Sequence, residues 1–529
     1  MKKIYNYIIT IGLGIAGGCT GDFLDTEPIT ELTDENFYRT TDDAYRALVG
    51  AYEGLHQIWS GGISFPVASE VLSDNAFGGT GAADGFGYQL LDEFDKNRAP
   101  DQNLFQDNWA GYYGAVFRCN SFLEKFDQID WEGNDELRNT YEAETRFLRA
   151  YLYFDMVRLW GNIPLLTSPS AENIPQADPA EVYAVIGEDL KFAVANLPSV
   201  PFAGQNVNEF GRATKWAAQA LLARVYLYYT GYYNQSDLAG TLTAAEALSH
   251  LEDIINNGGF GLVEDFAHLW PAASVEDYAG EINPEILFSI RYTYTSDYDG
   301  NTDGNMWMVM LGVREQSFYP YGRGWGGATV NPKLYQAFPS GDTRREASII
   351  AIDEENLPFT NQSRQREYTG YYTKKYSPMI NEEGVDLPID LGAPNHMIGQ
   401  FQDYFVIRYA DVLLMAAELG SANAQNYFNQ VRMRAYKENY SQLAVSQQNI
   451  MEERRLEFAL EGIRYWDLLR QGINTAAAVI SETTTVVNGG NPSTKTISAS
   501  NILATEGLQQ IPVNQIQLSD NVLKQNPGW

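Results

Sequence analysis

The chain of 529 residues is strongly acidic, with 36 Lys and Arg against 68 Asp and Glu and a net charge of -32. Nucleic acids and anionic lipid surfaces attract basic patches, so this balance argues against both as partners. The length fits roughly two to four domains, and the 44% hydrophobic content is enough for a large core. The composition therefore suits a soluble protein exposed at a surface.

The N-terminus has the form of a secretory signal. It begins M-K-K, continues with a mostly apolar run, and ends with the small residues Ala16-Gly17-Gly18 before Cys19. The run is too short to span a membrane. This pattern resembles the bacterial lipoprotein signal, in which Cys19 becomes the lipidated first residue of the mature chain, and an ordinary signal cut elsewhere is the alternative. We expect residues 1–18 to be removed and the acidic residues 19–35 to form a surface tether.

Apolar residues recur at helical three- and four-residue steps across residues 36–258. The segment from Leu137 to Trp160 is apolar around much of its circumference, which predicts a deeply buried helix. Paired Ala- and Tyr-rich helices with short connections are similar to tetratricopeptide hairpins, but no clean 34-residue period is present, and a generic bundle is the alternative. The predicted helices are Asn36–Leu55, Asn108–Phe126, Leu137–Trp160, Pro179–Leu197, Thr214–Tyr233 and Gly240–Asn257.

Residues 260–400 change character, from helices to loops and short strands. Ile286 to Tyr292 alternates apolar side chains with others, as a short strand does. Gly, Asp and aromatic residues follow it and indicate a loop-rich, ligand-bearing insertion. A second Gly-rich loop covers residues 60–88. Long structured loops are usually functional, so both regions are candidates for a binding site.

Helical periodicity returns at residues 401–475, and its most informative stretch is Ile450 to Gly472. This stretch has one apolar stripe and, on another face, charges spaced to pair at i,i+3 or i,i+4. It predicts a buried structural helix laced with ion pairs rather than a catalytic one, with Gly462 inside it and Gly472 as its cap. The other segments in this part are helices at Phe405–Leu419 and Ala422–Tyr436, a surface loop at 480–500 and coil through 476–529.

Two short motifs match binding loops by their letters but lack the required context. Gly322-x-Gly324-x-x-Gly327 matches a dinucleotide fingerprint, but Pro320 stands close before it where a strand is needed. Asp299-x-Asn301-x-Asp303-Gly304 matches the first half of a calcium loop, but Met310 stands where the closing acid belongs. We therefore expect no catalytic metal and no cofactor, with a structural calcium at residues 299–304 as an open alternative.

Aromatic residues within the Gly- and Asp-rich loops form the predicted ligand site. Flat rings stack on the C–H faces of sugars, and short polar side chains bond to the hydroxyls. We predict Trp307 and Trp325 as the stacking platforms, and Asp74 and Asn75 as the hydroxyl partners. Packing of each ring beneath its own loop is the alternative. The other rings predicted around the two platforms are Phe86, Tyr88, Tyr294 and Tyr298.

Several segments, taken together, resemble the SusD/RagB family of outer-membrane nutrient-binding lipoproteins from Bacteroidetes. The resemblance covers nearly the whole chain, and its most specific part is E-R-R-L-E-F-A-L-E-G-I-R-Y-W-D-L-L-R, within residues 450–472. The supporting segments are C-T-G-D-F-L-D-T-E-P from Cys19, E-V-L-S-D-N at 70–75, R-A-Y-L-Y-F-D-M-V-R-L-W-G-N-I-P-L at 149–165, G-R-A-T-K-W-A-A-Q-A-L-L at 211–222, R-Y-A-D-V-L-L-M-A-A-E at 408–418 and Q-N-P-G-W at 525–529.

This resemblance implies a mainly α fold in a single domain over residues 36–529, in which tetratricopeptide-like helical pairs support an irregular ligand-binding part. It also implies a non-enzymatic protein, lipid-anchored at Cys19 on the outer-membrane surface, that delivers glycans to a SusC-like TonB-dependent transporter. A peptide-binding lipoprotein of the RagB type is the alternative function. A glycoside hydrolase is a third, and it would need a carboxylate pair facing the aromatic loops.

Overall fold

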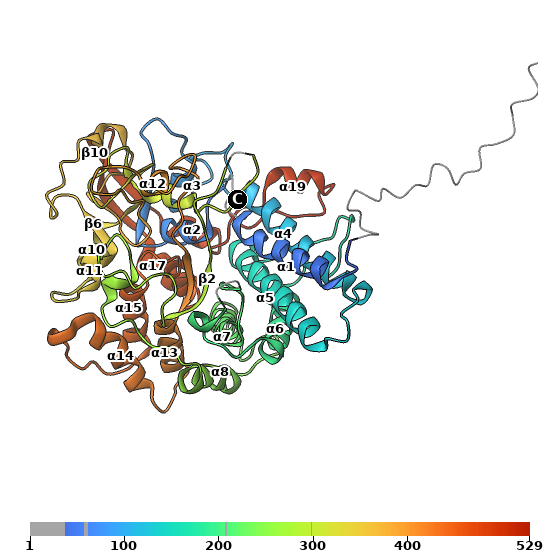
Figure 1. The fold of residues 1–529 in the computed structure, drawn as a ribbon. Coiled ribbons are helices and arrows are strands. Elements are labelled where there is room, and N and C mark those ends of the chain that lie inside the picture. Colours follow the sequence, from blue (N-terminus) through green and yellow to red (C-terminus); the bar gives the residue numbers. More distant parts are fainter. Residues whose placement is uncertain (1–36, 58–61, 207–208, 298) are drawn as a thin grey trace, which may run out of the picture.

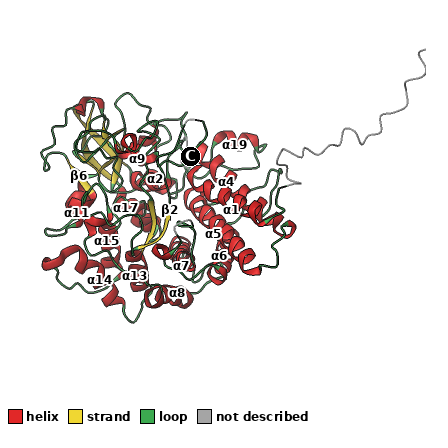
Figure 2. Cartoon of the chain, in the orientation of Figure 1, coloured by secondary structure: helices red, strands yellow, loops and turns green. Residues whose placement is uncertain are grey.

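The computed structural model describes residues 37–57, 62–206, 209–297 and 299–529 (Figure 1). Helices dominate this part of the chain, and the strands form short two-stranded sheets (Figure 2). The mainly α fold with a loop-rich part is therefore confirmed. The predicted signal and tether, including Cys19, lie outside the described residues.

A set of long helices forms the right-hand and lower part of Figure 1. Helix α5 is its centre, and nearly all of its side chains from Tyr141 to Trp160 are buried. It packs against α4 and α6, α6 packs against α7, and α7 packs against α8, as expected of successive helical pairs. The six helices predicted here are confirmed as α1 (Thr41–Gln57), α4 (Gln106–Lys125), α5 (Asp135–Trp160), α6 (Pro179–Asn196), α7 (Lys215–Tyr233) and α8 (Ala244–Asn257).

Local capping chemistry sets where these helices begin. The side chains of Asn134, Asp178, Thr214 and Thr243 each accept a hydrogen bond from a backbone N–H in the first turn of the helix that follows. Such caps satisfy amide groups that have no partner within the helix. The Thr243 cap is reciprocal, because Glu246 reaches back to its backbone N–H. These signals are local, which is why the sequence predicts the helices within a few residues.

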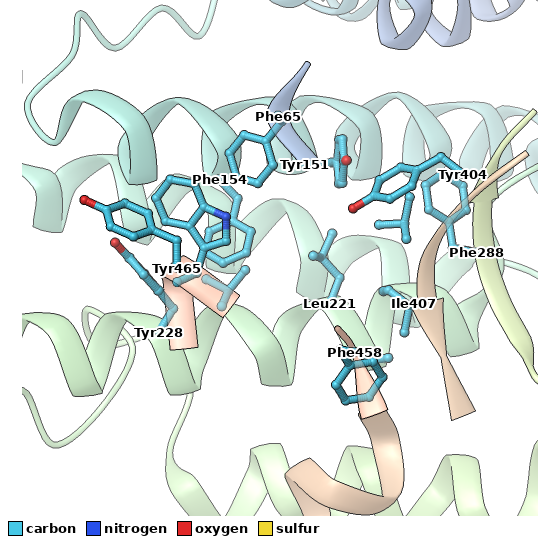
Figure 3. Close-up of a cluster of buried hydrophobic side chains, with 14 of the residues drawn as sticks. Phe65, Tyr151, Phe154, Leu221, Tyr228, Phe288, Tyr404, Ile407, Phe458 and Tyr465 are labelled. Carbon is cyan, nitrogen blue, oxygen red and sulfur yellow. The ribbon is translucent and has the colours of Figure 1, made fainter. Parts of the chain in front are cut away.

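A buried two-stranded sheet connects the helical part to the rest of the molecule. β2 (Ile286–Ile290) pairs antiparallel with β8 (Tyr404–Arg408), and every residue of both strands is buried. Figure 3 shows Phe288 of β2 and Tyr404 and Ile407 of β8 near Tyr151 and Leu221 of the long helices. The helix predicted from Phe405 was wrong over its first turn. Residues 405–408 belong to β8 and pair with β2, and α13 (Tyr409–Glu418) starts after them.

Short elements fill the loop-rich part of the chain. β1 pairs with β5 and β6 with β7, both antiparallel, whereas β3 and β4 are parallel. The elements are α2 (Phe65–Val71), β1 (Ala76–Gly79), α3 (Gly87–Asp92), α9 (Trp307–Leu311), β3 (Val313–Arg314), β4 (Arg323–Gly324), β5 (Gly327–Val330), α10 (Pro332–Ala337), α11 (Arg344–Ser348), β6 (Ile349–Ala351), β7 (Tyr371–Thr373) and α12 (Leu387–Asp390).

The single helix predicted over Ile450 to Gly472 is broken in its middle. α15 ends at Glu457 and α16 begins at Arg464, and Leu460 and Gly462 between them have φ of 65° and 80°. A Cβ on Gly462 would lie 2.6 Å from the Cα of Pro66, and its N–H donates to Glu70 Oε1 at 2.8 Å. The predicted close approach of a neighbour to Gly462 is therefore confirmed, and the neighbour is Pro66. Gly462 lies in the break between α15 and α16, however, and not inside a continuous helix.

The coil predicted for residues 476–529 was also wrong. Strands β9 and β10 form a hairpin, and Gly489 and Gly490 between them both have positive φ, as a tight hairpin turn requires. Cross-strand pairing stabilises a polar Thr-rich segment that has little helical or apolar periodicity of its own. The elements of this part are α14 (Ala424–Tyr436), α15 (Gln447–Glu457), α16 (Arg464–Leu469), α17 (Ile473–Ile480), β9 (Glu482–Asn488), β10 (Asn491–Ile497), α18 (Ala499–Ala504) and α19 (Val513–Leu518).

Ion pairs predicted for this region are present and buried. Glu457 accepts hydrogen bonds from Arg408 at 3.0 Å and from Arg344 at 3.1 Å, and it forms a third ion pair with Arg434. All four side chains are at most 3% exposed. Burial alone would raise the pKa of Glu457, but the nearby positive charges outweigh it and hold the pKa well below its usual value. The prediction of a buried structural segment with ion pairs is thus confirmed, but the segment is not one helix and the partners of Glu457 lie outside it. Of the predicted pairing at i,i+3 or i,i+4 within the segment, Asp467 with Arg470 at 2.8 Å is an example.

Candidate functional site

A cavity of about 680 Å³ lies between two loop-rich regions that are far apart in the sequence. One wall comes from α3 and the loop between α3 and α4, and the other from α9 and the connection between β4 and β5. The pairing of β1 with β5, from Ala76 opposite Val330 to Gly79 opposite Gly327, holds these regions together. Three of the predicted aromatic residues, Tyr88, Trp307 and Trp325, line this cavity.

Trp325 presents its ring to solvent at the cavity, with 44% of the residue exposed. Its backbone is nevertheless fixed, because its N–H donates to the carbonyl of Val309 at 2.7 Å. The next residue, Gly326, donates from its own N–H to the carbonyl of Gly312 at 3.0 Å. An exposed indole on a fixed backbone has the form of a stacking platform, because little ordering is needed when a ligand covers it.

Trp307 differs from the open platform that the sequence suggests. It is the first residue of α9 and only 2% exposed. Its ring packs edge-to-face against Tyr376 and Tyr404, with centroid distances of 5.0 and 5.7 Å. Trp307 therefore belongs mainly to the core and contributes only to the inner lining of the cavity. The alternative weighed for each ring, packing beneath its own loop, applies here.

Tyr88 lines the cavity, whereas Phe86, two residues earlier, is not among the lining residues. The exposed ring of Phe86 is covered by two guanidinium groups, that of Arg366 at 4.0 Å and that of Arg98 at 4.5 Å from its centroid. The hydroxyl of Tyr88 donates to the sulfur of Met310 at 3.5 Å, across the cavity wall. Burial raises the pKa of Tyr88, so its hydroxyl stays protonated at neutral pH.

Two of the predicted aromatic residues remain, Tyr294 and Tyr298. Tyr294 lies in the loop after β2 and is partly exposed, but it is not among the lining residues. Tyr298 lies outside the described residues. Their predicted contribution to the site stays a prediction.

Asp74 and Asn75 have framework roles in the structure, which corrects the reasoning that placed them at the ligand. Asp74 is buried and forms ion pairs with Arg464 at 2.7 Å and Arg455 at 2.8 Å. Burial would raise the pKa of Asp74, but these two charges outweigh it and lower the pKa. Asn75 is also buried and donates to Glu70 Oε2 at 3.0 Å. Both residues hold the start of β1 against α15 and α16, so neither is free for a sugar hydroxyl.

Sequence reasoning missed the polar side of the cavity. Gln102 and Asn103, from the loop between α3 and α4, line it together with Asp84 and Asp101. The signal was present, since Pro100 opens a run of Asp, Gln and Asn just before α4. Amide and carboxylate groups beside an exposed indole can hydrogen-bond hydroxyls while the ring stacks on a sugar face.

Comparison with known proteins agrees with the family resemblance found in the sequence. A family model described as the SusD family matches residues 352–529, and one described as "Starch-binding associating with outer membrane" matches residues 22–227. SusD-like protein P38 of Formosa agariphila is 27% identical over 511 residues, which cover 89% of this chain and 92% of that protein. Among the helices of the described residues, none combines the length and apolar character needed to cross a membrane.

Solved structures extend the likeness over nearly the whole chain. Surface glycan-binding protein A from Bacteroides fluxus has a TM-score of 0.77 and 26% identity, covering 93% of this chain and 100% of that one. A laminarin binding SusD-like protein has a TM-score of 0.73 and 27% identity, with the same coverage of both chains. These matches confirm the resemblance read from the sequence motifs: the chain is similar to SusD-like proteins over nearly its whole length.

Proposed function

We propose that the protein is a non-catalytic, cell-surface glycan-binding lipoprotein that captures an oligo- or polysaccharide in the cavity beside Trp325. The observation that carries this proposal is an exposed indole, held on a fixed backbone, at a cavity with polar groups on its opposite side. A similar solved structure is described as laminarin binding, which supports a glycan as the ligand class. The family description of starch binding in association with the outer membrane points the same way.

Stacking on Trp325 supplies affinity, and the polar groups supply orientation. The C–H face of a pyranose covers the indole and removes its apolar surface from water. The side-chain amide of Gln102 offers both a donor and an acceptor, so it can match a hydroxyl in either role. The cavity volume of about 680 Å³ is within the range of ordinary ligand sites.

Anchorage and delivery complete the proposal and rest on the sequence. Lipidation at Cys19 would hold the protein at the outer membrane, and the acidic tether would place the folded part away from it. A protein that captures glycan at this surface needs a partner to import it, and a SusC-like TonB-dependent transporter is the partner that the family resemblance implies.

Titration calorimetry with laminarin oligosaccharides tests the binding site. We expect Trp325→Ala to lower the affinity by about 1–3 kcal/mol, a range taken from stacking of other ring systems, with an unchanged melting temperature. Phe117→Ala is the matched control, because Phe117 is an aromatic residue of α4 that is 55% exposed and lies outside the cavity lining. Trp307→Ala is unsuitable as a binding test, since it would open a hole in the core.

Three outcomes would contradict the proposal. If Trp325→Ala binds glycan as tightly as the unmodified protein, the site is elsewhere. If the protein binds extended peptides and no glycan of a broad panel, the peptide-binding alternative replaces this one. If chromatography after long incubation reveals shorter sugars, the protein is a hydrolase and the non-catalytic part of the proposal is wrong.

A further inference from the structure

A second group of polar side chains lies where α1 meets the loop between β2 and α9. Glu53 and His56 are one turn apart on α1, and Asp303 comes from the loop. Nδ1 of His56 lies 3.2 Å from Oε2 of Glu53 and 3.8 Å from Oδ1 of Asp303. One oxygen or nitrogen atom from each residue lies within 4.8 Å of the other two. None of the three lines the candidate glycan cavity.

The orientation of His56 is fixed by two contacts. Its Nε2 lies 2.6 Å from the carbonyl oxygen of Arg291, which can only accept, so Nε2 carries the hydrogen. Its ring also stacks on Tyr292, with centroids 5.0 Å apart and planes inclined by 25°. In the neutral ring the lone pair of Nδ1 therefore points to the two carboxylates. This is the arrangement of histidines that bind metal ions, which donate their other ring N–H to a carbonyl or carboxylate.

The two carboxylates face the histidine without an arginine between them. The guanidinium groups lining the same cavity are paired with other acids, Arg291 with Asp403 at 2.6 Å and Arg212 with Glu144. The hydroxyl of Thr302 donates to Oε1 of Glu53, which leaves Oε2 directed at the histidine. A cation placed between the two carboxylates and the Nδ1 lone pair of the neutral ring would stabilise all three.

We propose that Glu53, His56 and Asp303 bind a divalent first-row transition metal ion of the zinc class. Bonds of about 2.0–2.2 Å at tetrahedral angles put neighbouring ligand atoms about 3.3–3.6 Å apart, and the two observed separations of 3.2 and 3.8 Å bracket this range. One imidazole with two carboxylates suits zinc or manganese, whereas calcium takes six to eight oxygen ligands. All three residues line a cavity of about 280 Å³.

This site differs from the calcium loop that the sequence suggested at residues 299–304. One oxygen of that motif is used within the loop, because Asn301 Oδ1 accepts from the N–H of Asp303 at 3.0 Å. The carboxylate of Asp303 turns instead toward α1. A bound ion would therefore attach the loop after β2 to the first helix of the framework, two segments that lie some 250 residues apart in the chain.

Metal binding by the chelator-treated protein tests this proposal. We expect equilibrium dialysis to give one tightly bound Zn²⁺ per chain, with Ca²⁺ bound far more weakly. His56→Gln and Asp303→Asn should each weaken Zn²⁺ binding by at least roughly tenfold, the smallest loss typical of residues that only support a ligand. Asp299→Asn is the matched control, because Asp299 belongs to the calcium motif but not to the group around His56. It should bind Zn²⁺ like the unmodified protein.

Two further measurements keep the proposal falsifiable if a variant loses stability. Circular dichroism shows whether each variant is folded, and anomalous diffraction at the zinc edge places the ion directly. A peak bonded to Glu53, His56 and Asp303 supports the site. The proposal is overturned by absence of stoichiometric Zn²⁺, by a peak elsewhere, or by Ca²⁺ binding that depends equally on Asp299 and Asp303.

Discussion

At the scale of single residues, the surroundings of a polar side chain decide whether it stabilises the framework or is available to a ligand. Glu457 and Asp74 are buried carboxylates that arginines keep ionised, so they stabilise the framework and are not available to a ligand. Gln102, by contrast, lines the candidate cavity. Sequence reasoning assigned Asp74 to the ligand because it is a short polar residue beside an aromatic loop. Its ion pairs could not be foreseen, because Arg455 and Arg464 lie almost 400 residues away.

Glu457→Gln should be strongly destabilising at neutral pH. Removing one member of a buried ion-pair network leaves the arginines uncompensated, which costs about 3–5 kcal/mol. The folded-state pKa of Glu457 lies below the usual value of 4.5, so its stabilisation is complete above that pH and is lost as the pH falls toward the folded pKa. Denaturant unfolding should therefore show a constant difference between the two proteins above about pH 4.5 and a narrowing one below it.

Glu452→Gln provides the comparison for this measurement. Glu452 is also on α15, but it is exposed and accepts a hydrogen bond from Gln448 in the same helix. Its replacement should change the free energy of unfolding by no more than about 0.5 kcal/mol. Equal effects of the two variants would show that the buried network adds nothing specific to stability.

At the scale of elements, those that depend on local signals could be predicted, and those that depend on distant partners could not. The long helices carry their own periodicity and caps, as at Thr243. β8 looked helical because its residues are uniformly apolar up to Ile407, and only its pairing with β2 makes it a strand. The break near Gly462 depends on Pro66 and Glu70, and the helical periodicity of the sequence continues across it.

Gly462→Ala should destabilise the protein more than Gly472→Ala does. Both glycines have positive φ, so each alanine incurs a backbone penalty of roughly 1–2 kcal/mol. At Gly472 the added methyl group meets no atom within 4 Å, whereas at Gly462 it lies 2.6 Å from Pro66. The clash should add roughly 1–3 kcal/mol for Gly462→Ala alone. Chemical denaturation measures both, and equal losses would mean that the contact with Pro66 relaxes without cost.

At the scale of the whole molecule, the site depends on tertiary structure that composition reveals only in part. Aromatic loops rich in Gly and Asp pointed to Trp325 and Tyr88, and the structure brings both to one cavity. The sequence could not indicate that pairing of β1 with β5 holds the two walls of this cavity together, or that Trp307 enters the core. Composition identifies residue types that suit sugars, but exposure of each ring is decided by packing from other parts of the chain.

The whole-molecule arrangement also predicts that membrane attachment and folding are separable. The proposed anchor, Cys19, stands at the start of the acidic segment 19–35 that the sequence predicts to be a tether, and it lies outside the described residues. Cys19→Ala should therefore leave the melting temperature and glycan affinity unchanged while moving the protein from the membrane fraction to the soluble fraction of the cells. Thr20→Ala changes the residue next to the anchor but keeps the cysteine, so it serves as the control and should stay with the membrane.

Fractionation followed by affinity capture would also test the proposed partner. The lipid and surface contacts would hold this protein beside the transporter. Capture of the protein from detergent-solubilised membranes should therefore also recover a large outer-membrane barrel protein. The Cys19→Ala protein should recover less, because the tether raises the effective concentration of the two partners at one surface. Retention of Cys19→Ala in the membrane fraction, together with capture that yields no barrel protein, would contradict both the anchor and the partnership.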